Sequence, residues 1–404
     1  MTPGRAAAKD SGLTASPPIV DGAAALGRSG SDRVFGLDLL RCTAILMVLV
    51  GHARFFVTPL LPAAGGLSVL GFLGVELFFV LSGFLIGGIV LRSFGDRPGP
   101  ATLGGFWIRR WFRTLPNYYL FLLVNLLLPQ EEAIRGFPRY ALFLQNLAWK
   151  ARLFFNESWS LAVEEWFYLL FPVLLALAAR ARGGLRRAAI ASLAVLFVAS
   201  TAARVAVVAS TSLSWDASIR KVVVYRLDAL MMGVLGAYLQ ARRPDAWARA
   251  RRGGAALGGV LFAAAVALYF ALDRNRSFFA KTFYFNLTSL SVFCFLPALD
   301  AWRDAGGAAA AWVRRISLWS YSLYLCQLPV ATLLIAGFGD PETMGRAFGV
   351  GHAVALSAAF LTLSIAVAAL VYTGFERPAM NLRERFRFPQ ERRRPSLGDA
   401  GPPM

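Results

Sequence analysis

Residues 66–91 read GLSVLGFLGVELFFVLSGFLIGGIVL and contain a single ionisable side chain, Glu76. A helix needs about 20 predominantly apolar residues to cross the hydrocarbon core of a bilayer. This stretch is long enough and apolar enough to do so. It therefore predicts a transmembrane helix.

The rest of the chain has the same character. Of its 404 residues, 57% are hydrophobic and 16% are charged, whereas about 25% charge is usual for a soluble domain. Long apolar runs alternate with short basic connectors, so we predict an all-α fold, a polytopic integral membrane bundle of about ten transmembrane helices. The predicted segments are Val34–Val57, Gly66–Leu91, Leu115–Leu128, Trp159–Ala179, Ala188–Ser210, Val222–Leu239, Ala255–Leu272, Phe278–Leu299, Ile316–Phe338 and Val350–Phe375.

Lysine and arginine are distributed unevenly among the connectors. If the amino terminus is cytoplasmic, 28 of the 42 basic residues fall in cytoplasmic loops and tails and nine fall in the opposite loops. This asymmetry predicts that both termini are cytoplasmic, and it explains most of the net charge of +19 without a nucleic-acid partner. We expect a transmembrane domain at 34–380, between a disordered tail at 1–33 and a basic disordered tail at 381–404.

Several kinds of site are not indicated. The three cysteines, Cys42, Cys294 and Cys326, lie within apolar runs, so we expect packing residues and no disulfide framework. No Cys or His pair has the spacing of metal ligands, and no phosphate-loop motif is present. We therefore predict no metal site.

The first predicted helix carries three ionisable residues, Asp38, Arg41 and His52. Eleven residues are about three helical turns, so Arg41 and His52 should project from one face, about 16 Å apart along the axis. Asp38 lies one turn before Arg41 and is expected to pair with it. The alternative is that Asp38 and Arg41 extend to one membrane surface while His52 sits at the other. A neutral imidazole is a natural general base for a hydroxyl.

Other polar residues also interrupt the apolar segments. Ser82 and Gly83 form a small pair in mid-span that would admit a neighbouring helix or a thin ligand. Arg110 and Arg113 are about one turn apart beside Arg109, and their guanidinium groups suit phosphate oxygens, although simple anchoring at the cytoplasmic surface is the alternative. The remaining polar candidates are Glu76 in the second segment, Glu164 and Tyr168 on one face of the fourth, Arg226 and Asp228 as an expected structural pair in the sixth, and Gln327 in the ninth.

Taken together, these motifs resemble the acyltransferase 3 family of membrane O-acyltransferases. The resemblance extends over about residues 33–380 and depends on the order of the motifs. They are Arg41 with His52, GVELFFVLSGFLI at 74–86, RRWFRTLP at 109–116, WSLAVEEWFY at 159–168, YRLDAL at 225–230, SYSLYL at 320–325 and FERP at 375–378.

The resemblance implies an enzyme of the bacterial inner membrane. Such an enzyme transfers an acyl group, usually acetyl, from cytoplasmic acyl-CoA to a hydroxyl of a carbohydrate, a glycolipid or a secondary metabolite. His52 and Arg41 would be the essential pair of the first helix, Arg110 and Arg113 would hold the CoA phosphates, and Glu164 would belong to the reaction chamber. We therefore expect Arg109, Arg110 and Arg113 at the cofactor site, and Ser82 and Gly83 along the path of the pantetheine arm.

Two positions depart from the family pattern: Glu76 stands where Asp is frequent, and Gln327 stands where His is frequent. The general base would then be His52, alone or with Glu164. A covalent acyl-histidine intermediate and Ser82 as a nucleophile are alternatives. A transporter or flippase without chemistry is the alternative function.

Overall fold

The computed structural model describes residues 33–95, 98–128, 133–151, 154–182 and 184–382, and these residues form thirteen α-helices and no strand. The helices are α1 (Phe35–Val57), α2 (Ser68–Ser93), α3 (Pro100–Leu127), α4 (Ala133–Ala141), α5 (Ser158–Arg182), α6 (Leu185–Ser210), α7 (Leu227–Arg242), α8 (Pro244–Ala271), α9 (Phe278–Lys281), α10 (Tyr284–Ala301), α11 (Gly307–Phe338), α12 (Pro341–Val371) and α13 (Arg377–Leu382). Four short 3-10 or π segments join them: η1 (Pro62–Leu67), η2 (Trp215–Arg220), η3 (Val223–Tyr225) and η4 (Tyr372–Glu376).

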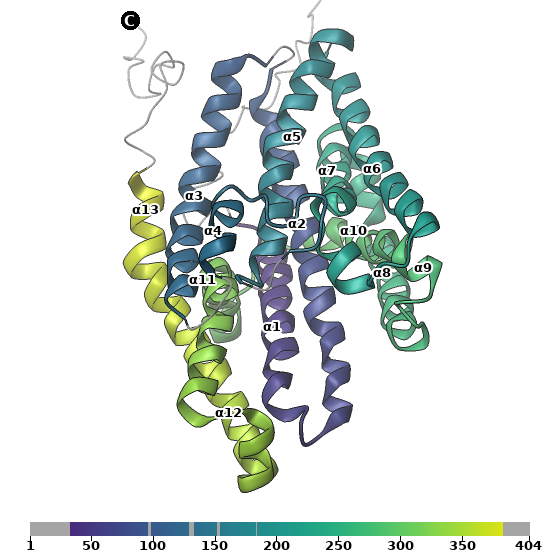
Figure 1. Ribbon diagram of the computed structural model, residues 1–404. Coiled ribbons are helices and arrows are strands. Elements are labelled where there is room, and N and C mark those ends of the chain that lie inside the picture. The colour runs from purple at the N-terminus through teal and green to yellow at the C-terminus, as the bar shows by residue number, and fades with distance from the viewer. Residues whose placement is uncertain (1–32, 96–97, 129–132, 152–153, 183, 383–404) are drawn as a thin grey trace, which may run out of the picture.

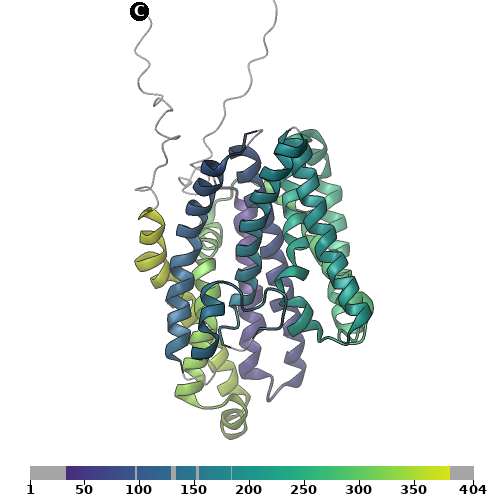
Figure 2. The same cartoon turned by 45° about the horizontal axis from the view of Figure 1, so that its top comes forward.

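A central hairpin organises the bundle. α1 and α2 run antiparallel through η1, and α5 lies over them (Figure 1). Helices α6 to α10 form one flank, and α11 to α13 form the other, together with α3. The tilted view shows the long helices running side by side between two ends (Figure 2). The predicted all-α membrane bundle is therefore confirmed.

Eight of the described helical segments are long and apolar enough to cross a membrane. They correspond to eight of the ten predicted segments. The other two predicted segments lie in α3 and α7, which fall short for different reasons. α3 carries the arginine cluster in its first half, and α7 has 16 residues. The expected disordered tails lie outside the described residues, apart from Arg33, Asn381 and Leu382.

Glycines allow α2 and α7 to approach closely. A Cβ atom on Gly83 would lie 1.9 Å from the Leu230 carbonyl oxygen of α7, and one on Gly233 would lie 2.0 Å from the Val80 carbonyl oxygen of α2. Any side chain at either position would force the two helices apart, because small residues are what permits this spacing. Gly83 therefore faces α7. The three cysteines are buried and unpaired, as predicted.

We predict that Gly233→Ala destabilises the bundle, since the added methyl group meets backbone atoms that cannot move independently. Overpacking of this kind costs about 1–3 kcal/mol in the free energy of unfolding. Gly259→Ala in α8 is the matched control, because a Cβ atom there meets nothing within 4 Å. Thermal unfolding of the purified proteins in detergent would measure both effects, and equal transition temperatures for the two variants would contradict the prediction.

Candidate functional site

Two cavities lie at opposite ends of the central helices. The arginine cavity, about 500 Å³, is lined by the first part of α1, the last part of α2 and residues such as Arg41, Arg110 and Arg113. The histidine cavity, about 530 Å³, is lined by the last part of α1, including His52, and by the first part of α2. Each is large enough for a small-molecule ligand. Val75 and Tyr324 line both cavities, so only a thin partition separates them.

The arginine cavity concentrates positive charge. Arg41, Arg110 and Arg113 all line it, and none of the three forms an ion pair with any residue that the structure describes. The Arg110 guanidinium lies over the Tyr168 ring, 4.4 Å from its centroid. Guanidinium groups without carboxylate partners in a cavity favour an anionic ligand, and their planar forks match phosphate oxygens.

A hydrogen-bonded acid forms one wall of the arginine cavity. The Ser82 hydroxyl donates to Glu164 Oε1 at 2.8 Å, and the Tyr168 hydroxyl donates to Glu164 Oε2 at 2.9 Å. The prediction that Glu164 and Tyr168 share a helix face is confirmed. The sequence had offered Ser82 no partner, because Glu164 lies 82 residues away along the chain.

Three expectations about this end of the bundle differ from the structure. Asp38 does not pair with Arg41; it accepts hydrogen bonds from Arg33 Nε at 2.9 Å and from the Ser317 hydroxyl at 2.8 Å. Arg33 precedes α1 and its side chain reaches forward to the first turn of that helix, and Ser317 comes from α11. Arg109 does not line the arginine cavity. Gly83 does not line it either, because it packs against α7.

His52 is held by the ninth predicted segment, α11. Its Nδ1 atom lies 3.0 Å from Gln327 Oε1. The Gln327 amide nitrogen donates to the Tyr324 carbonyl oxygen at 3.3 Å, which turns the amide oxygen toward the imidazole. An amide oxygen can only accept, so Nδ1 carries the proton and Nε2 keeps a free lone pair. Glu164 lines the other cavity and does not contact His52.

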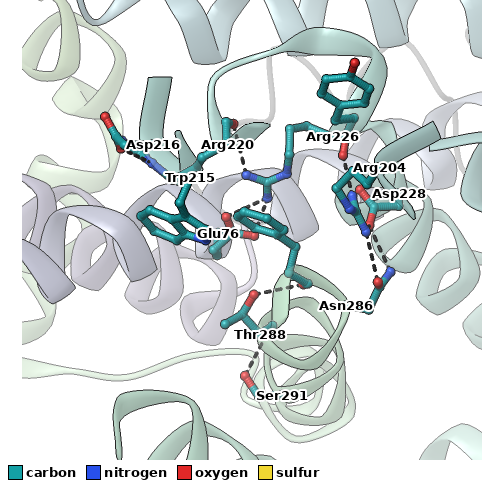
Figure 3. A network of polar contacts seen from close by, with 12 residues as sticks. Glu76, Arg204, Trp215, Asp216, Arg220, Arg226, Asp228, Asn286, Thr288 and Ser291 are labelled. Atoms are coloured by element: carbon teal, nitrogen blue, oxygen red, sulfur yellow. Dashed lines mark hydrogen bonds and ion pairs between the residues drawn. The ribbon is translucent and has the colours of Figure 1, made fainter. Parts of the chain in front are cut away.

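Two buried ion pairs cross the middle of the bundle (Figure 3). Arg226 donates from one terminal nitrogen to both carboxylate oxygens of Glu76, at 2.6 and 2.8 Å. Asp228 pairs with Arg204 of α6 at 2.8 Å and also accepts from Asn286 at 2.9 Å. The expected pairing of Arg226 with Asp228 is therefore wrong. Residues two apart at the start of a helix do not face each other, so each reaches a different neighbour.

Sequence reasoning missed several buried polar residues. Arg204 has no exposed surface and completes the Asp228 pair; a lone arginine inside the apolar run 188–210 was the available signal. Asn117 donates to Ser322 at 3.0 Å and to Glu376 at 3.1 Å, which links three helical segments. Glu157, just before α5, lines the histidine cavity. Among the described residues, no group of three or more His, Cys, Asp or Glu side chains is placed to hold a metal ion.

The rim of the histidine cavity combines charge with aromatic rings. Asp216 of η2 forms ion pairs with Arg220 at 2.6 Å and with Lys221 at 2.8 Å. Burial alone would raise the pKa of Asp216, but these two cations hold it well below its usual range. Trp159 and Trp215 also line the cavity, and the Arg220 guanidinium lies 4.7 Å from the centre of the Trp159 ring. The rim therefore combines charged hydrogen-bonding groups with tryptophan rings that are themselves packed, since both are 5% exposed and Trp215 stacks on Phe285.

A known protein family matches most of the chain. The family model described as an acyltransferase domain matches residues 34–373. This range contains every candidate site residue named above except Glu376 and Arg33.

Individual relatives match over a shorter range. The peptidoglycan O-acetyltransferase OatA of Listeria monocytogenes is 33% identical over 159 residues, which are 34% of this chain and 24% of that protein. A Staphylococcus aureus protein provisionally named an O-acetyltransferase is 36% identical over 158 residues, 35% of this chain and 24% of its own length. The matched region thus spans about a quarter of these curated relatives. No solved structure matches significantly.

We predict that Glu76→Gln is strongly destabilising, because it leaves the Arg226 guanidinium buried without a counter-charge. Breaking one side of a buried pair costs about 3–5 kcal/mol in the free energy of unfolding. The double variant Glu76→Leu with Arg226→Leu should cost less than Glu76→Leu alone. Denaturant unfolding followed by circular dichroism measures this. Glu342→Gln, at an exposed pair with Arg346, is the control and should cost less than about 1 kcal/mol; equal losses would refute the prediction.

Proposed function

The chain belongs to the acyltransferase family whose domain model covers residues 34–373, and on that basis we propose that it is a membrane O-acetyltransferase acting on a cell-envelope carbohydrate. The donor is acyl-CoA, with acetyl-CoA as the first choice. The observation that carries the proposal is the arrangement of the two cavities: three arginines without ion-pair partners line one, an oriented histidine lines the other, and Val75 and Tyr324 line both.

The arginine cavity is the proposed donor site. Arg110 and Arg113 bind the CoA phosphates, because they are the unpaired cations on α3 that face the cavity. Arg41 lies on α1 in the same cavity and draws the pantetheine arm inward. Ser82, held by Glu164, lines the path that the arm takes toward the partition. The thioester then reaches the boundary with the histidine cavity.

The histidine cavity is the proposed acceptor site, with His52 as general base. Nε2 removes the proton of the acceptor hydroxyl, and the hydroxyl oxygen attacks the thioester carbonyl carbon. The carbon–sulfur bond breaks, the CoA sulfur leaves as a thiolate, and the proton held by His52 returns to that sulfur. The products are an O-acetyl ester and free CoA.

The proposed setting is the bacterial inner membrane with both termini in the cytoplasm. This orientation gives the arginine cavity access to cytoplasmic acyl-CoA and opens the histidine cavity toward the opposite side, where envelope carbohydrates are exposed. The Listeria monocytogenes relative is named a peptidoglycan O-acetyltransferase, which makes a peptidoglycan saccharide the first acceptor to test, ahead of glycolipids and secondary metabolites.

We predict that His52→Ala and Arg110→Ala lose activity in different ways. In membranes supplied with radiolabelled acetyl-CoA and lysozyme-digested peptidoglycan, His52→Ala should lower the transfer rate by about 10²-fold or more, as expected for loss of a general base. Arg110→Ala should mainly raise the KM for acetyl-CoA, by about tenfold. Arg180→Ala, an exposed arginine of α5, is the control. Unchanged transfer by His52→Ala would refute the base assignment, and movement of label across the membrane without ester formation would indicate a transporter.

We predict that Gln327→Leu lowers kcat about tenfold while the KM for acetyl-CoA stays constant, because the imidazole loses the acceptor that fixes its tautomer. Gln240→Leu is the matched control, since Gln240 donates to Asp300 and lines neither cavity. The same loss in both variants, or no loss in Gln327→Leu, would count against this role.

A further inference from the structure

Glu157 is a buried acid that the proposed reaction does not yet use. Its side chain is 3% exposed. Neither carboxyl oxygen has a hydrogen-bond partner among the residues that the structure describes. Buried polar groups almost always have a partner, so an exception indicates that something else satisfies it. Glu157 lines the histidine cavity, where a ligand can reach it.

The backbone of Glu157 is fixed by the same helix that orients His52. The Tyr324 hydroxyl donates to the Glu157 carbonyl oxygen at 3.1 Å, and Ser160 Oγ lies 2.6 Å from that hydroxyl. Gln327, which holds His52, follows Tyr324 by one turn of α11. A single turn of α11 therefore positions both the imidazole and the acid beside one cavity.

None of the four cations that line this cavity forms an ion pair with Glu157 among the residues that the structure describes. Arg54 lies over the Phe55 ring, 4.7 Å from its centroid. Arg220 and Lys221 both bind Asp216. Arg274 lies over the Tyr269 ring, 3.9 Å from its centroid. Without a cation beside it, burial raises the pKa of Glu157, which precedes the membrane-spanning helix α5, to about 8. The neutral carboxyl that results at pH 7 offers one donor and one acceptor.

We propose that Glu157 contacts the acceptor directly, through hydrogen bonds to a hydroxyl or ring oxygen next to the hydroxyl that His52 deprotonates. This rests on the proposed function and deepens it. The acceptor must carry a second hydroxyl or ring oxygen close to the hydroxyl that reacts. A polyhydroxylated ring has such neighbouring oxygens, and a simple aliphatic alcohol does not. Glu157 is thus a specificity-determining residue for a carbohydrate.

The test compares Glu157→Leu and Glu157→Gln in the full chain, purified in nanodiscs. Acetyl-CoA is the donor, and the disaccharide-peptide released from peptidoglycan by lysozyme is the acceptor. Glu157→Leu should raise the KM for the disaccharide about tenfold or more, while the Kd for CoA and the unfolding temperature stay at wild-type values. Glu157→Gln keeps one donor and one acceptor, so its KM should stay within about threefold of wild type. Glu342→Leu, at an exposed glutamate of α12, is the matched control and should change neither constant.

Each other outcome has a definite meaning. An unchanged KM in a folded Glu157→Leu variant overturns the contact. Loss of turnover in Glu157→Gln also overturns it, because that would make the residue a general base. A parallel rise in the Kd for CoA would show that Glu157 acts on the fold. If the wild-type protein transfers no acetyl group to the disaccharide, the proposed function fails with this acceptor, and the role of Glu157 fails with it.

Discussion

The structure depends on the cost of placing charge inside an apolar bundle. An ionisable side chain at the centre of a membrane costs at least about 2.5–3.5 kcal/mol. Such residues therefore pair with one another or belong to functional sites. Glu76 with Arg226 and Arg204 with Asp228 meet this requirement by pairing across helices, and they tie α2, α6 and α7 together. Gly83 and Gly233 bring α2 and α7 close enough for this arrangement.

The ionisable side chains that these pairs leave out line the two cavities of the candidate site. Arg41, Arg110 and Arg113 face one cavity, and Glu157 and the oriented His52 face the other. A buried ionisable group without a protein partner is tolerated where a bound ligand supplies the missing counter-charge or hydrogen bond. Strongly perturbed ionisable groups therefore concentrate at functional sites. In this chain, ionisable groups in buried ion pairs hold the fold, and those without an ion pair are the ones proposed for binding and chemistry.

The sequence predicted contacts within one helix better than contacts between helices, because helical periodicity describes only one continuous segment. Helical spacing correctly placed Glu164 with Tyr168, and apolar runs located the helices, because both are properties of one continuous segment. Helical spacing gave the wrong partners for Arg226 and Asp228, which pair with residues of α2 and α6. It also gave the wrong partner for Asp38, which binds Arg33 and a serine of α11. Gly83 was assigned to ligand passage because small size alone does not say which neighbour approaches. Gln327 was recognised as unusual, yet its contact with His52 required the fold.

The thin partition at Val75 and Tyr324 also has an electrical consequence. Where water enters both cavities, the insulating path across the protein shortens to these side chains, and most of the transmembrane voltage falls across them. Moving one elementary charge through 100 mV involves about 2.3 kcal/mol. In the proposed reaction the neutral acetyl group crosses this field without electrical work, while the phosphates of CoA stay on the arginine side. The Tyr324 hydroxyl already forms hydrogen bonds with Ser160 and with the Glu157 carbonyl oxygen, so it is a poor ligand for an ion at the partition.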